Sequence, residues 1–171
     1  MQPFAPDQGT FGVAFPSSEV GRRVSDIGRA GGEMKRLECV LGAGPAAIPR
    51  ARACTFELLN PLQISWDERN AVAVAVQQVT ERVLRASGQP PSRLRFVGVC
   101  SRRKVRILVA WSGNGSGEAS ASLEMPDDLC FRDPVLHRLV DHCRELSSGS
   151  RRGVVLEKNL GETGDFPPNA V

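Results

Sequence analysis

The part of the chain that decides the fold is 82-RVLRASGQPPSRLRFVGVCSRRKVRILVAWSGNGSG-117. It contains two strand-like segments, 93–100 and 105–111, separated by the short polar turn 101–104. The first alternates, and in the second Val105, Ile107, Val109 and Trp111 fall on a single face. Alternation of this kind is typical of strands with one buried face, and a short polar link between two of them predicts a β-hairpin. Leu94, Phe96 and Cys100 should lie on the buried face of the first strand, with Arg93 and Arg95 on the opposite face.

The sequence around this hairpin predicts a third strand and two helices. Residues 118–125 alternate again, which extends the hairpin to a three-stranded meander. Before it, Ser65 and Glu68 have the spacing of a capping box, and a helical stripe of valines follows, so we expect a helix over 66–86. After it, Asp133 as N-cap and Pro134 at the first helical position predict a second helix, which should continue to Leu146 and end at Gly149.

The remaining segments complete the expected domain. Residues 34–41, 53–59 and 153–158 are strand candidates, and 42–52 is expected to be a loop. The order β-β-α-β-β-β-α-β predicts an α+β fold, a two-layer sandwich of a mainly antiparallel sheet with two helices on one face. We place the domain at 33–158, with flexible segments at 1–32 and 159–171 where Gly, Pro and Ser interrupt any period.

Composition limits the class of protein. A chain of 171 residues suits one domain, and no run of residues approaches the roughly 18 apolar residues of a membrane span. The five cysteines are odd in number and widely spaced, so we expect reduced thiols and an intracellular protein, in the cytoplasm or nucleus.

Several motifs favour catalysis or cofactor binding at first sight, and none satisfies its chemistry. Gly42 and Gly44 follow a strand as in a dinucleotide-binding turn, but Pro49 interrupts the helix that must come next. Asp133, His137 and Asp141 could share one helical face, but a metal ion needs a further ligand. We therefore expect no enzymatic activity, no catalytic residues, no cofactor and no metal.

Charge is the feature that predicts a function. Residues 82–117 contain eight basic residues and no Asp or Glu, although the whole chain has 22 basic and 19 acidic residues. A basic hairpin and sheet face suits the phosphates of nucleic acid, with duplex or structured RNA favoured because Phe96 and Trp111 lie on the apolar face and cannot stack on bases. The residues expected to contact phosphate are Arg93, Arg95, Arg102, Arg103, Lys104 and Arg106.

A second interpretation is a protein-assembly or adaptor subunit. It would dock an acidic protein on the basic face, or use the N-terminal segment as a peptide with apolar anchors at Phe4, Phe11 and Phe15. The sequence leaves the choice between RNA, DNA and protein open, and a homodimer is possible.

Overall fold

The structure is a computed structural model that describes residues 23–29, 32–86, 91, 93–112, 133–148 and 151–161. Three helices and six strands lie in these ranges. In chain order they are β1 (Arg23–Arg29), β2 (Gly32–Gly42), α1 (Ala47–Leu59), α2 (Trp66–Ala86), β3 (Arg93–Cys100), β4 (Lys104–Ser112), α3 (Pro134–Leu139), β5 (His142–Ser148) and β6 (Arg151–Asn159).

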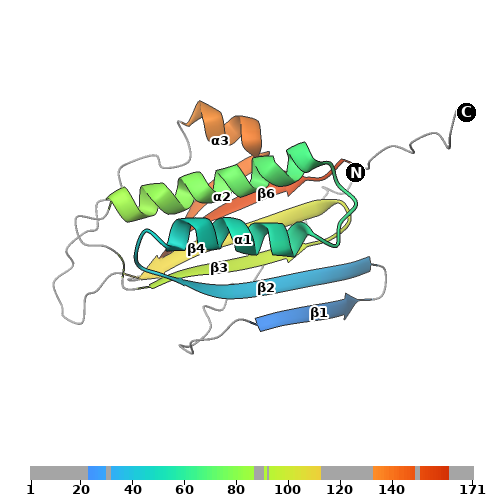
Figure 1. Ribbon diagram of the computed structural model, residues 1–171, viewed down its shortest axis with the longest axis horizontal. Helices are drawn as coiled ribbons and strands as arrows, with labels where there is room; N and C mark the ends of the chain where they lie inside the picture. The colour runs from blue at the N-terminus through green and yellow to red at the C-terminus, as the bar shows by residue number, and fades with distance from the viewer. Residues whose placement is uncertain are drawn as a thin grey trace, which may run out of the picture.

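The strands form one antiparallel sheet in the order β1-β2-β3-β4-β6-β5. The helices lie together on one face of this sheet, with α1 over β2 and β3 and α2 over β4 and β6 (Figure 1). The α+β fold expected from the sequence, a mainly antiparallel sheet with helices on one face, is therefore confirmed.

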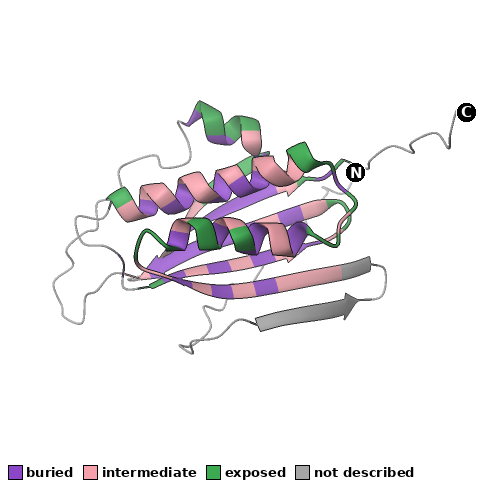
Figure 2. Cartoon of the chain, viewed as in Figure 1, coloured by how far each residue is buried: buried purple, intermediate pink, exposed green. Residues whose placement is uncertain are grey.

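The main core lies between the helices and the sheet. Every second residue of the central strands points toward the helices and is buried, including Leu37, Phe96 and Ile107 (Figure 2). The valine stripe of α2 packs against them, and Val76 has no exposed surface. Burying one such side chain contributes about 1.5–3 kcal/mol, so this layer is the main source of stability.

A glycine allows α1 to approach the sheet closely. Gly98 lies in the middle of β3 on the face that α1 covers. A Cβ atom at this position would collide with Leu58 Cδ2 and would lie 3.0 Å from the ring of Phe96. The absence of a side chain at Gly98 therefore allows Leu58, which is fully buried, to pack on the strand.

Two sequence predictions, a loop over 42–52 and a strand over 53–59, are wrong in most of their length. The chain forms the helix α1 from Ala47 to Leu59. Pro49 lies in the first turn, where a backbone N–H has no partner within the helix, so its missing donor does no harm. Buried residues recur at helical spacing in α1, from Ala47 and Ala51 to Leu58 and Leu59.

The prediction that the helix starting at Pro134 continues to Leu146 is also wrong beyond its first turns. Asp133 caps α3 as predicted, since its Oδ1 accepts a hydrogen bond from the N–H of Val135 at 2.7 Å. The helix ends after Leu139, and the strand β5 follows. Pairing with β6, which brings Cys143 opposite Leu156, overrides the helical spacing of the apolar residues.

Other boundaries differ at the edges of the domain. Residues 23–29, which we assigned to the flexible N-terminal segment, form β1 and pair with β2. Leu160 and Gly161, assigned to the flexible C-terminal segment, are held in place: Leu160 is buried, and Gly161 donates to Glu68. The strand expected at 118–125 lies outside the described residues.

The cysteines do not all behave as expected. Cys39, Cys54 and Cys100 are buried thiols, whereas Cys143 is disulfide-bonded. The expectation of five reduced thiols is therefore wrong for Cys143, because spacing along the chain does not report distance in the fold. In the part of the chain that the structure describes, no helix is long and apolar enough to cross a membrane.

Candidate functional site

The face of the sheet opposite the helices is strongly basic. Strand alternation and register place basic side chains from five strands on it, and we call this surface the basic face. Its basic residues are Arg36, Arg93, Arg95, Lys104, Arg106, Arg144 and Arg151, and its two carboxylates are Glu38 and Glu157. Among the described side chains of β2 to β6, basic groups thus exceed acidic ones by seven to two.

Glu38 holds two of the arginines in the first half of the basic face. Arg95 donates to Glu38 at 2.5 Å, and Arg36 lies 3.5 Å from the same carboxylate. The side chains of Arg95 and Glu38 are only 23% and 13% exposed, so solvent screens this pair less than an ordinary surface pair. Arg95 therefore already has an ion-pair partner within the protein.

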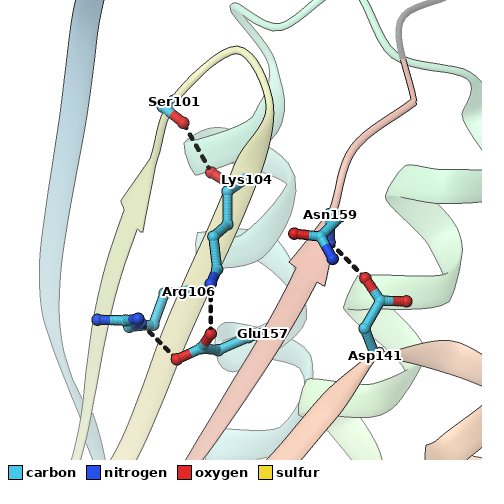
Figure 3. Close-up of polar contacts among 6 residues, drawn as sticks. All are labelled: Ser101, Lys104, Arg106, Asp141, Glu157 and Asn159. Carbon is cyan, nitrogen blue, oxygen red and sulfur yellow. Dashed lines mark hydrogen bonds and ion pairs between the residues drawn. The ribbon is translucent and has the colours of Figure 1, made fainter. Parts of the chain in front are cut away.

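Glu157 has the same role on β6 (Figure 3). Lys104 Nζ and Arg106 Nε each lie 2.6 Å from one of its carboxylate oxygens. Burial acts to raise the pKa of Glu157, but the two cations outweigh burial and hold that pKa below its ordinary value. The carboxylate is thus ionised at neutral pH, and one negative charge is shared by two positive ones.

The turn between β3 and β4 carries two exposed charges. Arg102 and Arg103 are both exposed there. Ser101 N–H donates to the carbonyl of Lys104 at 2.8 Å, and Leu160 N–H donates to the carbonyl of Arg103 at 2.8 Å. These bonds fix the backbone of the turn that carries the two exposed arginines.

Arg93 lies at the other end of β3, where it is exposed and faces Ser112 of β4. The six residues predicted to contact phosphate therefore do not form one cluster. They form an exposed turn, a half-buried middle in which acids pair with Arg95, Lys104 and Arg106, and an exposed far end at Arg93.

Apolar side chains occupy the centre of the basic face. Leu108, Ala110 and Val155 form a second buried cluster, separate from the main core, and Val97 and Leu146 pack against it. The charged residues surround this cluster along and across the strands.

Sequence reasoning missed the two carboxylates that pair with the predicted site. Glu38 alternates with Leu37 and Cys39, a pattern that could have placed it on the same face as Arg95. Glu157 belongs to a strand that the sequence did predict, but only the sheet order shows that this strand lies beside β4. Arg82, the first basic residue of the stretch, is also not free, since it forms an ion pair with Asp133.

The remaining site predictions concern aromatic side chains and metal ligands. Phe96 and Trp111 are buried on the helix-covered face, so they cannot stack on bases from the basic face. Phe4, Phe11 and Phe15 lie outside the described residues. The described residues contain no group of three or more His, Cys, Asp or Glu side chains that could hold a metal ion.

Comparison with known proteins supports the fold. No family model matches the chain, and no curated protein matches its sequence. A solved structure of the RsbU and RsbW domains of Rv1364c from Mycobacterium tuberculosis is similar, with a TM-score of 0.55 and 16% sequence identity. The match covers 73% of this chain and 32% of that chain, so this chain spans about a third of the larger protein.

Proposed function

We propose that this protein is a non-enzymatic module that binds nucleic acid through phosphate contacts made by the basic face and the turn of the β3–β4 hairpin. The observation that carries the proposal is the excess of seven basic over two acidic side chains among the described residues of β2 to β6 on one sheet face. Such an excess attracts a polyanion and releases its counterions, which is the main source of sequence-independent affinity.

The ion pairs weaken this attraction without abolishing it. Glu38 lies between two arginines, and Glu157 lies between Lys104 and Arg106, so each carboxylate is shared by two basic side chains. The exposed charges at Arg93 and Arg102 are at the two ends of β3. We therefore expect these end residues to contribute most of the phosphate contacts.

The separation of the two ends limits the kind of nucleic acid. Arg102 follows Arg93 by nine positions in the chain, which corresponds to about 30 Å in an extended strand. One turn of duplex DNA is about 34 Å long, so a duplex of roughly ten base pairs can reach both ends. The described part of the basic face has no aromatic side chain, which favours a duplex or structured RNA over a single strand.

This function places the protein in the cytoplasm or nucleus, where nucleic acid is present. The three buried thiols suit a reducing compartment. The disulfide at Cys143 is an exception, because disulfides are rare in reducing compartments.

The test compares two charge-removing double variants. Arg93→Gln with Arg102→Gln removes the exposed charges at both ends of the basic face. Arg50→Gln with Arg138→Gln removes two exposed charges on the helix side and leaves the net charge equal to that of the first variant. Binding of a 24-base-pair duplex is measured by fluorescence anisotropy between about 50 and 200 mM salt, the range over which binding to phosphates weakens steeply.

The first double variant should reduce the slope of log affinity against log salt by about 0.9 for each phosphate of B-DNA that the protein no longer neutralises, equally for unrelated sequences. The control should bind almost as the unchanged protein does. Equal losses of affinity in both variants would show that overall charge, and not the basic face, is responsible. If the unchanged protein does not bind at about 50 mM salt, the nucleic-acid proposal fails, and an acidic protein becomes the partner to test on the same face.

A further inference from the structure

The helix layer carries an exposed aromatic group that the basic face does not use. Trp66 is 65% exposed, and Val135 is the other large hydrophobic residue that is exposed in the described part of the chain. Trp66 is the first residue of α2 and lies within the capping box, in which Ser65 Oγ accepts from the N–H of Glu68 at 3.2 Å. Its backbone is therefore fixed although its side chain faces solvent.

A second aromatic ring holds the indole in place. Phe56 of α1 stacks on Trp66 with the ring centroids 5.4 Å apart and the planes 16° from parallel. A stack between two helices limits the rotation of an exposed Trp, so less side-chain entropy is lost when a partner binds it. Exposed and rigid Trp side chains are typical of the residues that dominate binding energy at protein interfaces.

A fixed cation lies on the same ring. The guanidinium carbon of Arg52 is 5.7 Å from the centroid of Phe56. Its nitrogens donate to Asn70 Oδ1 at 3.0 Å and to Gln77 Oε1 at 3.3 Å. Both acceptors are neutral amides, and no carboxylate pairs with Arg52 among the described residues, in contrast to Arg82 and Arg95.

We propose that Trp66, Phe56 and Arg52 form a docking site for a protein partner that presents a carboxylate to Arg52 and an apolar side chain to Trp66. The two amide acceptors hold the guanidinium group of Arg52 in position without neutralising its charge. A carboxylate of the partner would accept two hydrogen bonds from this guanidinium group and neutralise it. A protein segment fits better than a nucleic-acid strand, because it can present a single carboxylate to the one positioned cation, Arg52. A nucleic-acid strand carries a negative charge at every nucleotide and would bring further phosphates close to Asp67 and Glu68.

This site is independent of the proposed nucleic-acid interface. Arg52 and Phe56 belong to α1 and Trp66 to α2, and both helices lie on the face of the sheet opposite the basic face (Figure 1). A protein could therefore occupy the helix layer while nucleic acid occupies the sheet, and each site can fail its test without the other.

A displayed library of random 12-residue peptides is the probe. The library is selected on the immobilised full chain, with counter-selection on Trp66→Ala, which should fold normally because the indole is mostly exposed. Enriched peptides should carry an Asp or Glu within a few residues of an aromatic or large aliphatic side chain. A synthetic copy of the best peptide should change the fluorescence of Trp66, which can be distinguished because the chain has two Trp residues and Trp111 is only 5% exposed.

Matched variants locate the binding site. Arg52→Gln and Trp66→Ala should each weaken the selected peptide at least tenfold. Arg50→Gln, which removes an exposed charge from the same helix, and Val135→Ala, which trims the other exposed apolar residue, should leave its affinity within about twofold. Circular dichroism of each variant checks that the fold is retained.

Three results would overturn the proposal. One is a library without peptides that prefer the unchanged protein over Trp66→Ala. Another is enrichment of basic peptides, or of peptides whose affinity does not depend on Arg52. The third is quenching of Trp66 by a 12-residue deoxythymidine strand that competes with the selected peptide, which would assign the stack to nucleobases.

Discussion

Replacing Val76 by Asp tests the orientation of α2 on the sheet. Val76 has no exposed surface and lies on the stripe that packs into the main core. Loss of the buried Val side chain costs about 2 kcal/mol, and a carboxyl group without a partner at this position adds roughly 1–3 kcal/mol. The free energy of unfolding should therefore fall by about 3–5 kcal/mol, a large part of the 5–15 kcal/mol typical of a domain.

Val74→Asp is the matched control, because it introduces the same side chain two residues earlier in the same helix. Val74 is half-buried and lies on the outer side, so its substitution should cost much less. Urea unfolding followed by circular dichroism measures both, and the melting temperature of the Val76 variant should drop by about 10 °C. Equal costs at the two positions would refute the assignment of an inner and an outer face to α2.

Two further predictions concern packing and pH. Gly98→Ala should lower the free energy of unfolding by about 1–3 kcal/mol, because the added Cβ collides with Leu58. The control Gly44→Ala, whose Cβ meets nothing within 4 Å, should change the free energy of unfolding by less than about 1 kcal/mol. Equal effects of the two substitutions in thermal unfolding would contradict the close approach of α1 to the sheet. The folded-state pKa of Glu157 is lowered, so its contribution to stability is present at neutral pH and is lost as pH falls through that pKa. The difference in unfolding free energy between the unchanged protein and Glu157→Gln should therefore shrink below about pH 4.5, and a constant difference down to pH 3 would show that the ion pairs with Lys104 and Arg106 contribute nothing.

The local signals that proved reliable were those that agreed with each other. The helix Trp66–Ala86 has a capping box at one end, Gly and Pro after the other, and one apolar stripe between them. The hairpin of β3 and β4 has an alternating burial pattern in β3, and Val105, Ile107, Val109 and Trp111 recur on one face of β4 after a short polar turn. In each case the side chains themselves specify the period, so no distant contact is needed to choose the structure.

Local sequence patterns predicted the wrong secondary structure where a helix and a strand or loop were close in energy. In β5 the apolar residues Cys143 and Leu146 continue the helical spacing of α3, but backbone pairing with β6 decides for a strand. In α1, Pro49 indicates a break, although a proline in the first helical turn removes no hydrogen bond. Propensity differences of a few tenths of a kcal/mol are smaller than the gain from burying a strand or a helix face.

The candidate sites depend still more on tertiary structure. The residue types and periods of 82–117 were enough to predict a basic segment that contains a hairpin, with Arg93 and Arg95 on the side opposite its apolar residues. Only the fold decided which of these charges are paired, because Glu38 lies 57 residues from Arg95 in the chain. It also brought Arg52, Phe56 and Trp66 together from two helices. Residue types and local periods are properties of a segment, whereas an ion pair or a ring stack requires elements far apart in the chain to be packed side by side, and the burial of apolar surface by the whole domain determines that packing.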